Sequence, residues 1–169
     1  MLGYEVETLV TDVDESSITA PTPALLAKRL SEEKARRAAE LIGETPLPLI
    51  AADTLVECKG RIFGKPKDRS EAKDMLLALS GGKHYVHSGL TVIRNGKELS
   101  LVESATVWFR ELSPAEIEHY LDTGEPMDKA GAYGIQGPAA AFVPKIEGDF
   151  FTIVGLPLCR LTEILNNPL

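Results

Sequence analysis

The sequence has few cysteines and no long apolar run. Among its 169 residues, Cys58 and Cys159 are the two cysteines, and they lie far apart with no Cys-x-x-Cys spacing. This usage excludes a disulfide scaffold and a zinc knuckle, and it predicts free thiols in a reducing compartment. No apolar stretch approaches the ~20 residues that a membrane-spanning helix needs.

Positive charge is scarce as well. The formal net charge is −7, with 18 Lys and Arg against 25 Asp and Glu. This balance argues against a nucleic-acid surface and against binding to anionic membranes. The first twenty residues contain no Lys or Arg, unlike a secretory signal peptide. The sequence therefore predicts a cytoplasmic protein with no nucleic-acid or membrane partner.

Several common functional motifs are absent. There is no Gly-x-x-x-x-Gly-Lys-Ser/Thr phosphate loop, no Gly-x-Gly-x-x-Gly opening a helix, and no Gly-x-Ser-x-Gly. His84 and His87 are three positions apart on an expected strand, without a third ligand. We therefore expect them on a sheet surface or edge rather than at a metal.

The patterns that are present predict a mixed α/β fold, with a central mixed twisted sheet flanked by helices. The length suits one domain over residues 1–169, or two small lobes sharing a cleft. Thr22-Pro23 and Ser113-Pro114 are typical helix starts, and Asn95-Gly96 is a strong hairpin signal. The expected strands lie at 4–10, 47–56, 85–94, 97–110 and 139–146, and the expected helices at 23–43, 69–79, 114–124 and 158–165.

Two acidic groups are candidates for chemistry. The first is Asp12-Val13-Asp14-Glu15, which is either a solvated loop or a site for a hard metal such as Mg²⁺. The second is Asp53, the one acid in an apolar strand. It is either a cap or buried ion pair, or a carboxylate that deprotonates water.

A hairpin count places Lys65 beside Asp53. If Lys59-Gly60 forms a two-residue loop, Cys58 pairs with Arg61, and Thr54 then falls opposite Lys65. Lys65 could screen phosphate charge next to the acid. A third candidate is the glycine-rich loop at 128–137, where backbone N–H groups can approach a ligand and Gln136 offers a donor and an acceptor.

Together, these segments resemble the Maf family of nucleoside triphosphate pyrophosphatases, in family order over nearly the whole chain. The matching segments are Asp12-Val13-Asp14-Glu15-Ser16, Lys34-Ala35, Ala52-Asp53-Thr54, Gly64-Lys65-Pro66, Leu79-Ser80-Gly81, Gly124-Glu125-Pro126, Asp128-Lys129-Ala130-Gly131-Ala132-Tyr133-Gly134-Ile135-Gln136-Gly137 and Val154-Gly155-Leu156-Pro157. The resemblance implies a two-lobed Maf/ITPase-like fold with a cleft, often as a homodimer.

The resemblance also implies an activity and site residues. Nucleoside triphosphates would be hydrolysed to the monophosphate and pyrophosphate, with a divalent cation (Mg²⁺ or Mn²⁺) as cofactor. Asp53 would accept the proton of the attacking water, Glu15 and Asp53 would hold the metal, and Lys34 and Lys65, with Glu15, would form the phosphate site. Thr54 and Gln136 are similar to the specificity positions of the branch that acts on dTTP and UTP.

One departure from the family pattern is plain. Family members begin with a strand and a Ser-x-Ser-Pro-Arg-Arg phosphate loop, and no Ser-Pro-Arg-Arg occurs here. A misassigned or truncated start and a shortened, inactive relative are the two interpretations. The functional alternatives are a non-catalytic nucleotide-binding regulator of cell division and a pyrophosphatase for modified purine nucleotides.

Overall fold

A computed structural model describes residues 3–167 of the chain. Within these residues, five strands form one sheet in the order β2-β1-β3-β4-β5, and every strand pair is antiparallel. The strands are β1 (Leu49–Cys58), β2 (Arg61–Phe63), β3 (Lys83–Arg94), β4 (Lys97–Trp108) and β5 (Lys145–Glu147). The α-helices are α1 (Pro23–Ile42), α2 (Arg69–Leu79), α3 (Pro114–Asp122), α4 (Phe150–Val154) and α5 (Leu158–Asn166).

The predicted α/β class is therefore confirmed, with an antiparallel rather than a mixed sheet. Tight hairpins explain the direction of the strands. Lys59-Gly60 joins β1 to β2, and Asn95-Gly96 joins β3 to β4, with positive φ at all four residues. Turns of this backbone type match the twist of antiparallel strands.

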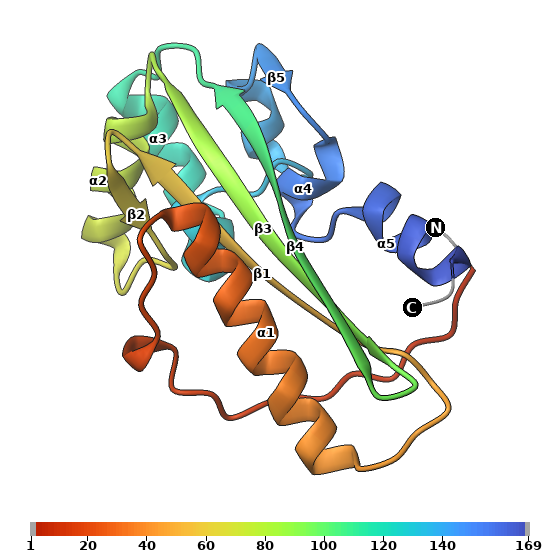
Figure 1. Ribbon diagram of the computed structural model, residues 1–169. Helices are drawn as coiled ribbons and strands as arrows, with labels where there is room; N and C mark the ends of the chain where they lie inside the picture. Colours follow the sequence, from red (N-terminus) through yellow and green to blue (C-terminus); the bar gives the residue numbers. More distant parts are fainter. Residues whose placement is uncertain (1–2, 168–169) are drawn as a thin grey trace.

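The helices lie on both faces of the sheet (Figure 1). Helix α1 crosses one face, against β1, β3 and β4. It begins where Thr22 caps the backbone N–H of Leu25 and Pro23 occupies the first turn. The other face is covered by α2, α3, α4 and α5, and two apolar clusters form there, one centred on Val86 and Tyr120 and one on Leu90 and Leu161.

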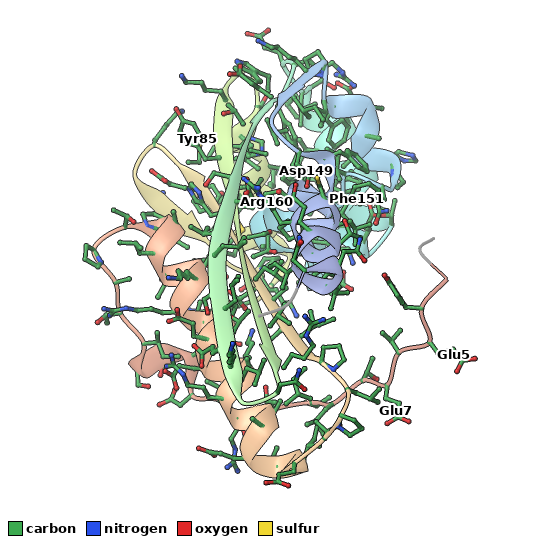
Figure 2. The ribbon with its side chains drawn as sticks, turned by 45° about the vertical axis from the view of Figure 1, so that its right-hand side comes forward. Glu5, Glu7, Tyr85, Asp149, Phe151 and Arg160 are labelled. Atoms are coloured by element: carbon green, nitrogen blue, oxygen red, sulfur yellow. The ribbon has the colours of Figure 1, made fainter. Side chains whose placement is uncertain are left out.

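Two predicted strands are wrong. Residues 4–10 form no strand, and the apolar side chains of Val6 and Val10 are exposed. Glu5 and Glu7 stand clear of the body of the molecule in Figure 2. Residues 139–146 form mainly the 3₁₀ helix Pro138–Phe142 (η4), which buries Ala139 and Phe142 three positions apart, and only the short β5 follows.

Strand β1 has one partly open edge. It pairs with β3 along Leu49–Glu57, but β2 covers only Val56–Cys58 on the other side. Among the described residues, the rest of that edge has no strand partner. Asp53 and Thr54 lie on this stretch, and both residues are partly buried.

Candidate functional site

One cleft of about 710 Å³ lies beside the open edge of β1. Its size suits a small-molecule ligand. The structure brings every site residue predicted from the sequence into the wall of this cleft: Glu15, Lys34, Asp53, Thr54, Lys65 and Gln136. These residues come from the 3₁₀ helix Glu15–Ser17 (η1), from α1, from β1, and from the loops that follow β2 and α3.

The centre of the site is an ion-paired cluster of three residues. Lys34 Nζ lies 2.8 Å from Glu15 Oε1 and also donates a hydrogen bond to Asp53 Oδ1. The Asp53 side chain is only 11% exposed, whereas that of Glu15 is 55% exposed. The cluster therefore has a desolvated acid on the sheet, a second acid at the mouth of the cleft, and a lysine between the two acids.

Close helix packing positions Lys34. Gly89 pairs with Asp53 across the sheet, and a Cβ at Gly89 would lie 2.2 Å from the carbonyl oxygen of Ala27. Only glycine allows α1 to approach the sheet this closely. Two turns further along α1, Lys34 lies on the same side of the helix as Ala27 and reaches back toward the helix start, as helical side chains do.

A local cap presents Glu15. Asp14 Oδ1 accepts hydrogen bonds from Ser16 N at 3.1 Å and Ser16 Oγ at 2.6 Å. These bonds hold the short turn of η1 from which Glu15 reaches Lys34. In the acidic group Asp12-Val13-Asp14-Glu15, Glu15 alone lines the cleft, and Asp14 shapes the backbone.

The electrostatics of the cluster favour a proton acceptor at Asp53. Burial raises the pKa of the Asp53 carboxyl above its ordinary value, against the opposing effect of Lys34. Burial lowers the pKa of Lys34, but the hydrogen bonds to Asp53 and Glu15 outweigh it, so the net pKa is raised and the lysine stays charged. A carboxylate with a raised pKa is a better general base near neutral pH.

Lys65 lies in the cleft, but the hairpin does not continue to it. The predicted register holds for Cys58 with Arg61 and ends at Val56 with Phe63. Gly64 then turns away, because its carbonyl accepts the N–H of Gly131 at 3.1 Å. Lys65 acts on Asp53 at longer range, lowering the pKa of that acid by its charge.

The glycine-rich loop forms the opposite wall of the cleft. Gly131 has φ of 70°, and a Cβ there would lie 3.0 Å from Val56 methyl groups, so the position requires glycine. Tyr120 Oη accepts the N–H of Gly134 at 3.1 Å, and Tyr133 Oη bonds His84 Nε2 at 2.8 Å. The loop is therefore anchored on buried aromatic side chains.

Two polar residues of the site were not singled out from the sequence. Glu125 packs so tightly on Gly137 that a Cβ there would lie 1.8 Å from its Oε1, and its Oε2 is buried without a partner among the described residues. Ser88 is fully buried and bonds Thr54. Two features of the sequence could have pointed to them: a hydroxyl residue within an apolar strand for Ser88, and a Gly-Glu-Pro segment before the glycine-rich loop for Glu125.

The two histidines were expected on a sheet surface or edge, and this prediction is wrong for His84. His84 is fully buried against Phe109 and Tyr133, and burial lowers its pKa to about 4. His87 lies between Glu57 and Ser104 on the sheet. Across residues 3–167, no three His, Cys, Asp or Glu side chains gather as a metal site.

The cleft offers two carboxylates as ligands for a divalent cation. Glu15 and Asp53 provide hard carboxylate oxygens on either side of Lys34. Two carboxylates do not fill a coordination shell, but Mg²⁺ commonly binds one or two of them and takes its other ligands from water and substrate phosphates. The donor set therefore suits a cation that arrives with a phosphate substrate.

Comparisons with known proteins find similar sequences over nearly the whole chain. The family model described as "Maf-like protein" matches residues 1–168. A protein of Vibrio cholerae serotype O1 is 42% identical over 165 residues, which cover 98% of this chain and 88% of that protein.

Two further relatives come from other organisms. The protein of Alkaliphilus oremlandii is 46% identical over 168 residues, covering 98% of this chain and 86% of its own length. The protein of Methanosarcina barkeri is 45% identical, and the match covers 98% of this chain and 84% of that protein. All three relatives carry the name dTTP/UTP pyrophosphatase.

Within residues 3–167, no helix is both long and apolar enough to cross a bilayer.

Proposed function

The chain belongs to the Maf family, and from this membership we propose that it hydrolyses dTTP and UTP to the nucleoside monophosphate and pyrophosphate. The observation that carries the proposal is the Glu15–Lys34–Asp53 cluster inside the cleft. It combines a desolvated carboxylate with a fixed cation, which are the two elements that water attack on a phosphate chain requires.

The proposed reaction uses these residues in defined roles. A water oxygen forms a bond to the α phosphorus, and the bond from that phosphorus to the bridging oxygen breaks. Pyrophosphate leaves with the electron pair, while the Asp53 carboxylate accepts the proton of the water. Its raised pKa supports this role.

The lysines act on the phosphates. Lys34 and Lys65 line the same cleft as Asp53, and their charges offset the negative charge of the triphosphate. When Mg²⁺ or Mn²⁺ is bound, it neutralises phosphate charge and polarises the reacting phosphoryl group. Glu15 and Asp53 are the residues that would hold it.

Base selection is proposed for the other side of β1. Consecutive strand residues point to opposite faces, so Thr54 faces away from the Asp53 cluster. Thr54 and Gln136 both line the cleft, next to Gly155 and Gly137 respectively. We assign the pyrimidine base to these two residues.

The free thiols of Cys58 and Cys159 support the cytoplasm as the location of the protein.

The test is pyrophosphate release by the whole chain with Mg²⁺ from dTTP, UTP, CTP and GTP. We expect release from dTTP and UTP, and a loss of roughly 10²–10⁴-fold in Asp53→Asn, because the base is removed. Asp74→Asn is the matched control, since Asp74 is an exposed acid on α2 outside the cleft. Equal release by the wild type and Asp53→Asn would contradict the assignment of Asp53.

A further inference from the structure

A chain of hydroxyl groups runs from the cleft into the core behind β1. Thr54 Oγ1 and Ser88 Oγ are 2.7 Å apart, on paired positions of β1 and β3. Ser88 Oγ in turn donates to the carbonyl oxygen of Thr152, also at 2.7 Å. Ser88 and Thr152 are fully buried, so water cannot replace either partner.

The direction of these hydrogen bonds follows from counting protons. A serine hydroxyl has one proton, and the Thr152 carbonyl can only accept. The Ser88 proton is therefore directed at Thr152, and Ser88 must accept from Thr54. The single proton of Thr54 is used in that bond. The carbonyl oxygen of Gly155, at 3.5 Å from Thr54 Oγ1, is at the limit of hydrogen-bond length and competes poorly.

Thr54 is thereby left with lone pairs and no proton for a ligand. Its side chain lines the cleft, and Gly155 beside it has no side chain to cover the hydroxyl. A Cβ at Gly155 would lie 3.3 Å from Thr54 Oγ1. The oxygen that a ligand meets at this point is an acceptor.

We propose that Ser88 is a positioning residue that fixes Thr54 as a hydrogen-bond acceptor, and that Thr54 thereby selects nucleotide bases that present an N–H at ring position 3. The inference rests on the proposed function and names the chemistry behind its base preference. Uracil and thymine carry a proton on N3, whereas the N3 of cytosine carries a lone pair that would face the lone pairs of Thr54.

The geometry separates two roles on adjacent residues. Asp53 points to the α1 side of β1 and faces Lys34, whereas Thr54 points to the α4 side and faces Ser88. A nucleotide in the cleft can then place its phosphates beside the first residue and its base beside the second. Within the described part of the chain, the Ser88 hydroxyl bonds only the Thr54 hydroxyl and the Thr152 carbonyl, so it acts through Thr54.

The experiment is a double-mutant cycle between Ser88→Ala and Thr54→Val, read as the ratio of kcat/KM for UTP to that for CTP. We expect Ser88→Ala to lower this ratio by roughly 10- to 100-fold, because the freed Thr54 proton can rotate to meet either base. Ser88→Thr keeps a hydroxyl and should restore most of the ratio. In the Thr54→Val background, Ser88→Ala should have no further effect on the ratio.

A purely structural role of Ser88 would give a different result. In that case kcat/KM for UTP and CTP would fall together and the ratio would stay constant, which overturns the proposal. An effect of Ser88→Ala that persists in the Thr54→Val background would also overturn it. N3-methyl-UTP, which lacks the donor, should behave in the wild type like CTP.

Binding of the monophosphates makes the inference independent of turnover. UMP and CMP are titrated calorimetrically into the wild type and into both single variants. A wild type that releases no pyrophosphate but binds UMP more tightly than CMP contradicts the proposed reaction and supports the base selection. Equal affinity of the wild type for UMP and CMP overturns the inference, whatever the activity.

Discussion

Single residues decide the chemistry of the cleft through their burial. Asp53 was the one acid in an apolar strand, and the sequence suggested it for that reason. The hairpin count also brought Lys65 to it, but the direct partner is Lys34, nineteen positions before it on α1. Spacing within a hairpin is local and countable, whereas the approach of a helix to a sheet depends on packing that a single sequence does not display.

Ser88 and Glu125 illustrate the same limit. Each is an ordinary polar residue in the sequence, and each becomes informative when its partners are known. The direction of a hydroxyl proton is decided by neighbours from three separate elements. No pattern along one strand contains that information.

The buried His84 leads to a prediction about how stability depends on pH. Its folded pKa of about 4 lies below the ordinary 6.5, so between these values the unfolded chain binds a proton that the native protein does not. Stability therefore falls as the pH drops from about 7 toward 4, by roughly 3 kcal/mol from this group. His84→Gln should lose this part of the pH dependence, as measured by urea unfolding at pH 7, 5.5 and 4.5.

The matched control is His119→Gln, because His119 is exposed on α3. Other acids also titrate in this range, so the informative quantity is the difference between each variant and the wild type at each pH. A constant difference between His84→Gln and the wild type across the three pH values would show that His84 does not titrate in this way.

At the scale of elements, the helices with strong end signals were predicted closely. The Thr22 and Ser113 caps are formed as expected, and in the Ser113 cap the backbone N–H of Ser113 also donates to the Glu116 carboxylate. The first and the last of the expected strands were not predicted correctly. Residues 4–10 have a strand-like composition but no partner in the sheet, and 139–146 follow Gly-Pro, which starts a 3₁₀ turn.

The contact of α1 with β3 carries the second prediction. Gly89→Ala would place a Cβ 2.2 Å from the Ala27 carbonyl oxygen, so α1 must move away from the sheet. We expect the free energy of unfolding to fall by about 1–3 kcal/mol. Pyrophosphate release should fall by more than the unfolded fraction explains, because Lys34 moves away from Asp53 with the helix.

Gly82→Ala is the control for this variant. A Cβ at Gly82 would meet the Leu79 carbonyl oxygen at 3.7 Å, an ordinary contact distance. Chemical denaturation and activity are measured on both variants. If Gly89→Ala were as stable and active as Gly82→Ala, the close approach of α1 would not position Lys34.

At the scale of the whole molecule, the cleft is assembled from distant parts of the chain. Its walls extend from Glu15 to Gly155, and they include α1, β1 and the glycine-rich loop. The sequence pointed to most of these segments, but it did not show the strand order or which faces they share. Those depend on contacts between residues far apart in the chain, which length and periodicity do not specify.

A ligand in such a cleft should stabilise the whole protein, which is the third prediction. UMP at a hundred times its dissociation constant should raise the free energy of unfolding by about 2.7 kcal/mol. Thermal unfolding followed by circular dichroism measures this shift. Hydrogen exchange should slow together in η1, β1 and the glycine-rich loop, since all three line the cleft.

Uridine is the control ligand, because it lacks the phosphate that Lys34 and Lys65 are proposed to bind. Slower exchange confined to one of the three segments would show that the ligand does not bridge the walls of the cleft.

The partly open edge of β1 also affects how the protein behaves at high concentration. On the side of Leu49–Leu55 away from β3, the described residues provide no strand partner, so an extended segment of another molecule can add there, which is a route to aggregation. Ile50 on that stretch is 39% exposed and adds an apolar surface. The net charge of −7 keeps molecules apart by mutual repulsion. Because salt screens that repulsion, the protein should stay in solution best at low ionic strength.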